Sequence, residues 1–284
     1  MKLGLIQMRA SSTGEDGLEA AVALTRQAAV AGAEVIVLPE LFRWPYPAQT
    51  MDPANFRWAE PVPGPTSDRF ASLAAELGVV IVVSLFEERA PGLGFNTAVV
   101  VGPSGETIGV YRKAHIPDDP LYYEKFLFTP GDEAAGVFDT PFGRLGVLVC
   151  WDQWYPEAAR LAALQGAEVI VYPTAIGTIE AEGVEEHARQ LDAWRVVQRG
   201  HAVANGVFVA AVNRVGAEGE LAFWGASFCA GPQGELLWDG GADPDAVAVV
   251  DCARERLAEV RRMWPFFRDR RIDLYAPITR RWLR

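Results

Sequence analysis

The segment Gly143-Arg144-Leu145-Gly146-Val147-Leu148-Val149-Cys150-Trp151-Asp152 contains an apolar run of strand length that ends at Cys150. Shortly after it, Pro156 and Glu157 begin an alanine-rich segment, and proline is well tolerated in the first turn of a helix. This pattern predicts a strand, a turn at Cys150 and then a helix. A thiol beneath a helix N-terminus is favoured as the thiolate, so Cys150 is a candidate nucleophile. The alternative is a buried, unreactive cysteine, which is the usual state of a free thiol.

The same strand pattern occurs twice in the chain. Residues 145–149 resemble residues 3–7, and residues 167–171 repeat residues 33–37 letter for letter as Ala-Glu-Val-Ile-Val. An alanine-rich segment with helical spacing lies between the two strands of each copy, at 17–31 in the first. Two such strand–helix–strand units predict an α/β fold with an internal pseudo-two-fold repeat.

Apolar and β-branched runs elsewhere predict further strands, and runs with helical spacing predict further helices. The expected strands are at 79–84, 95–101, 106–112, 207–213, 223–230 and 235–250, and the expected helices are at 66–77, 190–204 and early in 254–284. Residues 113–143 are expected to be irregular. No linker-like or low-complexity segment divides the sequence, so we expect one domain over residues 1–284.

The composition disfavours several classes of protein. Half of the 284 residues are hydrophobic, which suffices for an extensive core, and 26 Lys and Arg residues against 37 Asp and Glu residues give a net charge of −11. This balance disfavours a nucleic-acid partner and favours neutral or cationic ligands. Three cysteines in so long a chain form no disulfide framework and fit a reducing compartment. With no signal peptide or membrane-spanning run expected, we predict a cytoplasmic protein without a membrane partner.

Two charged residues follow predicted strands directly. Glu40 comes after the apolar run 35–38 and a proline, and Lys113 comes after the strand expected at 106–112. Ligand sites of α/β sheets lie at the carboxyl ends of strands, so both side chains are candidate site residues. The alternative for both is a solvated position in a loop, where most charged residues lie.

Two more polar residues stand near Lys113. Glu124 lies among aromatic residues in Tyr122-Tyr123-Glu124-Lys125-Phe126, and is either a solvated acid or a structural carboxylate in an aromatic-walled pocket. His115 permits a Cys–His dyad, but no second feature supports that arrangement. The sequence has no H-E-x-x-H, C-x-x-C, G-x-G-x-x-G or P-loop motif. We therefore expect side-chain chemistry without a metal ion or cofactor.

Three separated motifs carry a resemblance to a known family. The motifs Leu38-Pro39-Glu40-Leu41-Phe42, Tyr111-Arg112-Lys113 and Cys150-Trp151-Asp152 stand in the order of the catalytic Glu, Lys and Cys of the nitrilase superfamily of carbon–nitrogen hydrolases. The sequence resembles this superfamily from residue 3 to about residue 275. The resemblance implies a four-layer α–β–β–α sandwich and a catalytic trio of Glu40, Lys113 and Cys150.

The resemblance also implies a role for each site residue. Glu40 would take the proton of Cys150, while Lys113 and the Trp151 backbone N–H would hold the oxyanion. Glu124 matches an additional family glutamate that positions the substrate and supports Lys113. The residues implied to bind a small-molecule substrate are Tyr46, His115, Glu124, Trp151, Thr174 and Ala175.

Within the superfamily, segments 113–132, 150–157 and 172–177 resemble the N-carbamoylputrescine amidases. Relatives that cleave carbamoyl amino acids often carry an Arg pair after the cysteine, where this chain has Gln153 and Trp154. An ammonium-bearing substrate is therefore favoured, and its candidate partners are Asp118, Asp119, Glu182, Glu185 and Glu186. The alternatives are an amidase for another small linear amide or an N-carbamoyl amino acid, and a catalytically silent binding protein.

The end of the chain has a composition of its own. Residues 261–284 are basic and rich in aromatic side chains, with no regular period. So many apolar rings are unfavourable in water, and C-terminal extensions of the superfamily pack on neighbouring subunits. We therefore expect an oligomerisation tail and a homo-oligomer, either a dimer or a multiple of dimers.

Overall fold

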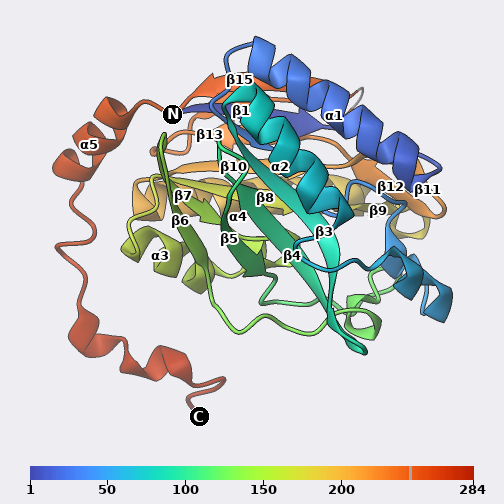
Figure 1. Ribbon diagram of the computed structural model, residues 1–284. Coiled ribbons are helices and arrows are strands. Elements are labelled where there is room, and N and C mark those ends of the chain that lie inside the picture. The colour runs from blue at the N-terminus through green and yellow to red at the C-terminus, as the bar shows by residue number, and fades with distance from the viewer. Residues whose placement is uncertain (243–244) are drawn as a thin grey trace.

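Two stacked β-sheets form the centre of the molecule, with helices outside them (Figure 1). The computed structural model describes residues 1–242 and 245–284. The first sheet contains, in spatial order, β15 (Ala246–Asp251), β1 (Lys2–Gln7), β2 (Val35–Val37), β3 (Val80–Ala90), β4 (Leu93–Val101) and β5 (Thr107–Arg112). The second contains β14 (Leu236–Asp239), β13 (Phe228–Ala230), β10 (Phe208–Asn213), β8 (Val169–Thr174), β7 (Gly143–Val147) and β6 (Gly136–Thr140).

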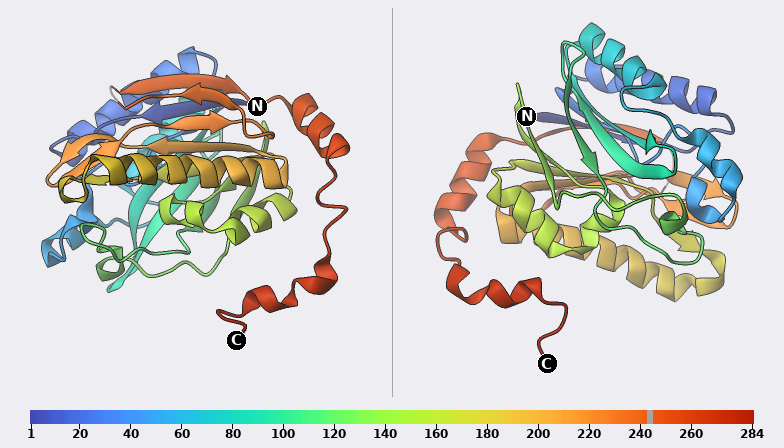
Figure 2. Two further views of the ribbon diagram at one scale, coloured as in Figure 1. Left: turned by 180° about the vertical axis from the view of Figure 1, so that it is seen from behind. Right: turned by 60° about the horizontal axis from the view of Figure 1, so that its bottom comes forward.

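Four helices complete the sandwich. Helices α1 (Gly14–Val30) and α2 (Pro65–Leu77) cover the first sheet, and α3 (Pro156–Leu164) and α4 (Val184–Asn205) cover the second (Figure 2). The Thr13 hydroxyl caps α1 by accepting a hydrogen bond from the Asp16 N–H, and prolines begin α2 and α3. The four-layer α–β–β–α sandwich expected from the resemblance is confirmed.

The two sheets repeat one topology. Strands β1 and β2 run parallel with Leu3 opposite Val35, and β7 and β8 run parallel with Leu145 opposite Val169. The next strand in each sheet, β3 or β10, is also parallel, and the strand after it, β4 or β13, is antiparallel. The predicted internal pseudo-two-fold repeat is therefore confirmed.

A close backbone approach is repeated in the two halves. Gly4 of β1 and Gly146 of β7 occupy equivalent positions in the registers of their sheets. A Cβ atom at Gly4 would lie 2.8 Å from the Cβ of Ala33, and one at Gly146 would lie 3.2 Å from the Cβ of Ala167. Because both alanines begin the repeated Ala-Glu-Val-Ile-Val sequence, the repeat preserves this contact as well as the strands.

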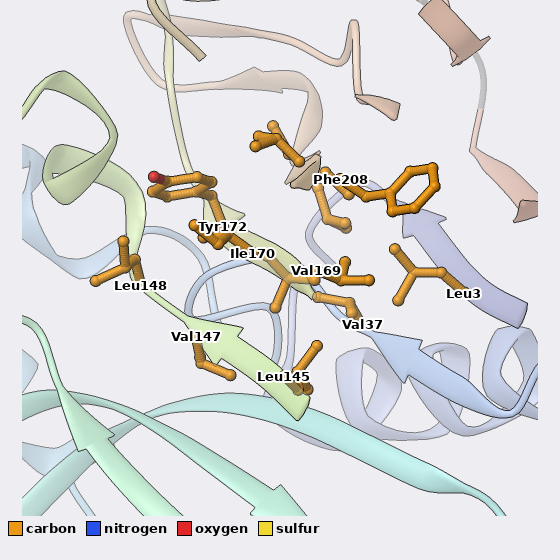
Figure 3. Close-up of a cluster of buried hydrophobic side chains, with 14 of the residues drawn as sticks. Leu3, Val37, Leu145, Val147, Leu148, Val169, Ile170, Tyr172 and Phe208 are labelled. Carbon is orange, nitrogen blue, oxygen red and sulfur yellow. The ribbon is translucent and has the colours of Figure 1, made fainter. Parts of the chain in front are cut away.

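The main core contains side chains from both sheets (Figure 3). Leu3 and Val37 of the first sheet belong to one fully buried cluster with Leu145 of the second. Alternate residues of the same strands point the other way, since Ile36 packs with Leu18 of α1 in a separate cluster. This alternation buries both faces of each sheet, as the continuous apolar runs of the sequence require.

Several predicted boundaries are wrong. The strand expected at 223–230 is interrupted at Gly225, where φ is +58°, and divides into β12 (Leu221–Trp224) and β13. Strand β12 joins β9 (Gly177–Ile179) and β11 (Val215–Glu218) in a three-stranded sheet, and neither β9 nor β11 was predicted. The strand expected at 235–250 divides into β14 and β15, which lie in different sheets, and residues 243–244 of that prediction lie outside the described residues.

Other differences lie at the ends of elements and in short segments. Helix α1 begins at Gly14 instead of residue 17, α4 begins at Val184 instead of residue 190, and β6 lies in the stretch expected to be irregular. The predictions required long patterns, and strands or turns of three to five residues contain too few positions to show one. The short 3₁₀ helices are η1 (Pro47–Gln49), η2 (Pro53–Trp58), η3 (Glu124–Phe126), η4 (Cys150–Trp154), η5 (Glu180–Glu182), η6 (Ile272–Leu274) and η7 (Ala276–Thr279).

The C-terminal segment leaves the sandwich after α5 (Arg254–Met263) and extends away from it (Figure 1, red). Apolar side chains along it are open to solvent, including Ile272 at 71% exposure and Trp282 at 79%. In the part of the chain that the structure describes, no helix has the length and apolar character needed to span a membrane.

Candidate active site

Four residues from separate segments of the chain meet in one buried cluster. Glu40 follows β2, Lys113 follows β5, Glu124 begins η3, and Cys150 begins η4 after β7. Lys113 Nζ lies 2.8 Å from Glu40 Oε1, and 2.9 and 2.7 Å from Glu124 Oε1 and Oε2. The side chains of Glu40, Lys113 and Glu124 are all 0% exposed, which excludes the alternative of solvated loop residues.

The two carboxylates surround a single ammonium group. Burial lowers the pKa of Lys113, but the charges of Glu124 and Glu40 outweigh it, so the net shift is upward and Lys113 stays charged. Burial raises the pKa of Glu124 to about 7, against the opposing effect of Lys113. The cluster therefore holds a permanent cation beside a carboxyl group that titrates near neutral pH.

Two polar residues orient these carboxylates. The Tyr46 hydroxyl donates to Glu124 Oε1 at 2.6 Å, and Asn96 Nδ2 donates to Glu40 Oε1 at 2.6 Å. Behind Glu40, the Arg214 guanidinium donates to the Glu40 backbone carbonyl at 3.0 Å. Arg214 is itself held by Glu218 at 2.7 Å, so a buried ion pair fixes the loop that carries Glu40.

Cys150 stands at a sharp turn between β7 and η4. Its φ of +41° lies in the left-handed region, which is unusual for a residue other than glycine and is typical of functional sites. Burial raises the pKa of the thiol well above its ordinary value, and the Glu40 carboxylate raises it further. The prediction that the turn favours a thiolate is therefore wrong, because the thiol is fully buried and helix α3 begins only at Pro156.

Asp152 fixes this turn to the segment that carries Lys113. Its carboxylate accepts hydrogen bonds from the Val149 N–H at 3.0 Å, the Tyr111 hydroxyl at 2.8 Å and the His115 N–H at 3.0 Å. The His115 ring lies 2.7 Å from the same carboxylate through Nδ1 and stacks on Tyr155. The geometry gives His115 a structural partner and offers no support for a Cys–His dyad.

A cavity of about 380 Å³ opens at Cys150. Its aromatic wall is formed by Tyr122, Trp151, Trp154 and Trp224. Asp119 and Glu182 also line it. The cavity is large enough for a small linear substrate, and it combines apolar walls with two carboxylates and a thiol.

The structure brings most of the predicted site residues together. Cys150, Trp151 and Ala175 line the cavity, and the Ala175 carbonyl oxygen lies 3.8 Å from Cys150 Sγ. Thr174 is buried, with its hydroxyl 3.3 Å from Gln153 Oε1 and its carbonyl accepting from the Glu40 N–H at 3.4 Å. The side chains of Thr174 and His115 thus contact protein groups and are not among the described residues that line the cavity. The same holds for Tyr46 and for the buried ionic cluster of Glu40, Lys113 and Glu124.

The five candidate partners for an ammonium group are divided by the structure. Asp119 and Glu182 line the cavity, whereas Glu185 and Glu186 lie 3.3 and 3.1 Å from Arg189 on α4. Asp118 is not among the described lining residues. Over residues 1–242 and 245–284, no group of three or more His, Cys, Asp and Glu side chains is arranged to hold a metal ion.

Sequence reasoning missed three residues of the site. Asn96 and Arg214 both donate to Glu40, from 56 and 174 residues away in sequence. Asp152 accepts a hydrogen bond from the His115 N–H, 37 residues away. Only Asp152 carried a visible signal, because it follows Cys150 by two residues. The available sign for Asn96 was the polar pair Asn96-Thr97 within an otherwise apolar strand.

Comparison with known proteins agrees with this geometry. The model of the carbon–nitrogen hydrolase family matches residues 2–262. The chain belongs to this family, also called the nitrilase superfamily, whose members hydrolyse carbon–nitrogen bonds such as those of amides.

Individual relatives are similar over nearly the full length. The N-carbamoylputrescine amidase of Solanum lycopersicum is 46% identical over 261 residues, which cover 89% of this chain and 86% of that protein. The crystal structure of a carbon–nitrogen hydrolase from Helicobacter pylori G27 has a TM-score of 0.95 at 44% identity, covering 100% of this chain and 99% of that one. A mutant of the amidase from Nesterenkonia sp. AN1, with a TM-score of 0.78 at 26% identity and coverage of 100% and 97%, carries the acetamide moiety of fluoroacetamide, covalently added at its active-site cysteine.

Proposed function

We propose that the protein is a thiol amidohydrolase that cleaves the carbamoyl carbon–nitrogen bond of N-carbamoylputrescine to give putrescine, carbon dioxide and ammonia. The observation that carries this proposal is the cavity at Cys150, whose described lining residues include Asp119 and Glu182 but no Lys, Arg or His. Such a wall suits a linear substrate with an ammonium end and repels a carboxylate end. Relatives that bear the name N-carbamoylputrescine amidase support the same substrate.

The reaction begins with the thiol in its protonated form, as the raised pKa of Cys150 requires. Glu40 takes the proton, and the sulfur attacks the carbamoyl carbon. The carbonyl oxygen becomes an oxyanion that Lys113 and the Trp151 backbone N–H stabilise, a contribution of about 3 kcal/mol per donor. Glu40 then returns the proton to the departing nitrogen, and ammonia leaves a carbamoyl group on the sulfur.

Water completes the turnover. Glu40 takes a proton from water, the hydroxide attacks the carbamoyl carbon, and the carbon–sulfur bond breaks with the proton returned to sulfur. The carbamate product loses carbon dioxide to give the amine. Through its two oxygens, Glu124 holds Lys113 where the oxyanion forms, and Tyr46 in turn holds Glu124.

The direct test is ammonia release from a panel of substrates. The panel contains N-carbamoylputrescine, N-carbamoyl-D- and L-amino acids, N-carbamoyl-β-alanine, glutamine and a simple nitrile. We expect strong preference for N-carbamoylputrescine. Preference for a carboxylate-bearing substrate would keep the chemistry and overturn the substrate. Silence on the whole panel together with a Cys150 that iodoacetamide does not alkylate would support a binding protein without catalysis.

The acidic wall has its own test. Glu182→Gln removes one carboxylate from the cavity, and Glu185→Gln is the matched control because Glu185 faces Arg189 instead. Since Glu182 is exposed, we expect its loss to raise KM for N-carbamoylputrescine by about fivefold or less, with kcat unchanged. An equal effect of both variants would argue against Glu182 as a partner of the ammonium group.

We also propose that the exposed C-terminal tail packs on a neighbouring subunit of a homo-oligomer. Phe267 still packs against the main core of its own chain, whereas Ile272, Ile278 and Trp282 are more than half exposed. Truncation after Arg270 therefore removes only the unpartnered part and should shift the protein to smaller species on a sizing column. An unchanged elution position would refute the proposal.

Three free, buried cysteines fit the cytoplasmic location that we propose for the protein.

A further inference from the structure

Glu40 uses its two carboxylate oxygens unequally. Oε1 accepts hydrogen bonds from Lys113 Nζ at 2.8 Å and from Asn96 Nδ2 at 2.6 Å. Oε2 is buried and has no hydrogen-bond partner among the described residues. A buried oxygen without a donor is costly, and such atoms in native structures call for a functional explanation. The electron pairs of Oε2 are the ones that remain free to accept a proton.

Asn96 is placed to create this difference. It lies in the middle of β4 and is 0% exposed, and its backbone carbonyl accepts the Lys113 N–H at 2.9 Å while its side chain holds Glu40. Its own side-chain oxygen, Oδ1, has no partner among the described residues. Burying that unpartnered oxygen costs stability, which an apolar side chain of similar size would avoid. The useful part of the Asn96 amide is therefore its N–H donor, which holds Glu40 Oε1.

We infer that Asn96 is a positioning residue that assigns different tasks to the two oxygens of Glu40: Oε1 is anchored, and Oε2 is left to take the proton of Cys150. This inference rests on the roles of Glu40 and Cys150 given under Proposed function. Asn96 acts through Glu40 and is not among the described residues that line the cavity.

The arrangement has a consequence for the pH dependence of the reaction. A hydrogen bond to a carboxylate favours the ionised form over the protonated form, and Asn96 supplies one such bond to Oε1 of Glu40. The other titratable or charged groups that face Glu40 are Tyr46, Lys113, Tyr122, Glu124, Cys150 and, at its backbone, Arg214. All of these remain when Asn96 is replaced, so a change in the acid limb reports the loss of this one donor.

The test uses two variants and a matched control. Asn96→Leu removes the amide at similar volume, and Asn96→Ala removes it with less steric demand. Thr97→Val is the control, because the neighbouring Thr97 is equally buried and donates to a different glutamate, Glu87, at 2.7 Å. Glu40→Gln gives the behaviour of a protein without the base. The readouts are kcat/KM and KM across pH for the best panel substrate, the rate of Cys150 alkylation by iodoacetamide across pH, and thermal unfolding.

We expect both Asn96 variants to move the acid limb of kcat/KM, and of the alkylation rate, to higher pH. At the optimum, kcat falls by about tenfold while KM changes by less than about twofold, because positioning of the base affects chemistry and not binding. Thr97→Val should lose similar thermal stability and leave the acid limb of both kcat/KM and the alkylation rate unchanged.

The inference is overturned if the acid limbs of the Asn96 variants match that of Thr97→Val while Glu40→Gln has lost activity and rapid alkylation. If Glu40→Gln itself keeps the kcat/KM and alkylation profile of the unmodified protein, the proposed role of Glu40 fails, and the inference fails with it. Because alkylation needs no turnover, a protein inactive on every panel substrate still allows the role of Asn96 to be tested. The smaller Ala variant provides the comparison if Asn96→Leu does not fold.

Discussion

The two halves of the sandwich share a scaffold and differ in what they carry at the ends of their strands. After the repeated Ala-Glu-Val-Ile-Val sequence, one half continues to Glu40 and the other to Thr174, at the same distance and after a proline in both. Along the preceding strands, Met8 of the first half corresponds to Cys150 of the second. The proposed base, Glu40, and the proposed nucleophile, Cys150, therefore stand at non-equivalent strand ends of two equivalent scaffolds.

The halves also differ in charge. Glu40, Lys113 and Glu124 belong to the first half or to the segment that follows it, and they form the buried ionic cluster. The second half supplies the thiol and much of the cavity wall, including Trp154 and Trp224. The pseudo-symmetric backbone sets where a site can form, and the broken symmetry of a few side chains sets the chemistry.

The largest expected effect comes from exchanging residues at one pair of equivalent positions. Cys150→Ala should lower amide hydrolysis by about 10⁴-fold or more, because no other thiol lines the described cavity and the nucleophile is lost. Met8→Leu, at the equivalent position, conserves volume in the core and should change the rate by less than about twofold. Ammonia release measures both. A Cys150→Ala protein that keeps its activity would remove the functional difference between the two strand ends.

A second prediction tests the charge difference through the pH dependence of stability. Glu124 keeps its proton up to a pKa of about 7 in the folded protein, against 4.5 for its ordinary value. Between these values the folded state binds more protons than the unfolded state, so the free energy of unfolding falls as pH rises through this window. Because one proton is involved, the fall is about 1 kcal/mol per pH unit at its steepest.

Urea unfolding at several pH values between 4.5 and 8 provides the measurement. Glu124→Gln has no proton to lose and should show a flatter dependence across the same window, which makes it the control for every other titrating group. Equal slopes for the two proteins would show that Glu124 is ionised throughout and that the ionic cluster does not carry this cost.

The smallest effect concerns the repeated glycines. A Cβ at Gly4 meets the Cβ of Ala33 at 2.8 Å, which forces a shift, whereas the equivalent distance at Gly146 is 3.2 Å, which a small adjustment relieves. Gly4→Ala should therefore cost about 1–3 kcal/mol of stability. Gly146→Ala should cost less, because its steric clash is milder, and the gain of about 0.4–1 kcal/mol from restricting the unfolded chain, which both variants share, offsets more of it. Thermal unfolding of both variants decides. Equal costs would mean that the two halves are packed alike at this contact, and a reversed order would mean that the second half is the tighter one.

The scaffold was predictable because its strand–helix–strand pattern is long and occurs twice in the sequence. The letter-for-letter repeat at 33–37 and 167–171 indicated two related units, and the structure places these segments in β2 and β8 at equivalent positions of the two sheets. Strands β9 and β11 were not predictable. They have three and four residues and exist because β12 lies between them, so tertiary contacts and not local pattern determine them.

The site was predictable only in part. The chain order of Glu40, Lys113 and Cys150 is visible through resemblance, but what surrounds them is not. Asn96 and Arg214 reach Glu40 from 56 and 174 residues away, and no local pattern encodes such contacts. The ionisation of Cys150 was wrongly predicted for a related reason: a turn is visible in sequence, whereas the depth at which the thiol is buried depends on both sheets.

The protonated resting state of Cys150 bears on how the protein withstands oxidants. Peroxides and disulfides react with thiolates far faster than with thiols, so a cysteine whose pKa is raised by burial and by a neighbouring carboxylate presents a poor target. Under the proposed role of Glu40, the sulfur becomes a thiolate as it attacks an electrophile bound in the cavity, so the free protein holds its nucleophile mainly as the less reactive thiol. The negative charge of Glu40, which raises the pKa of the Cys150 thiol, thus also lowers its rate of reaction with oxidants.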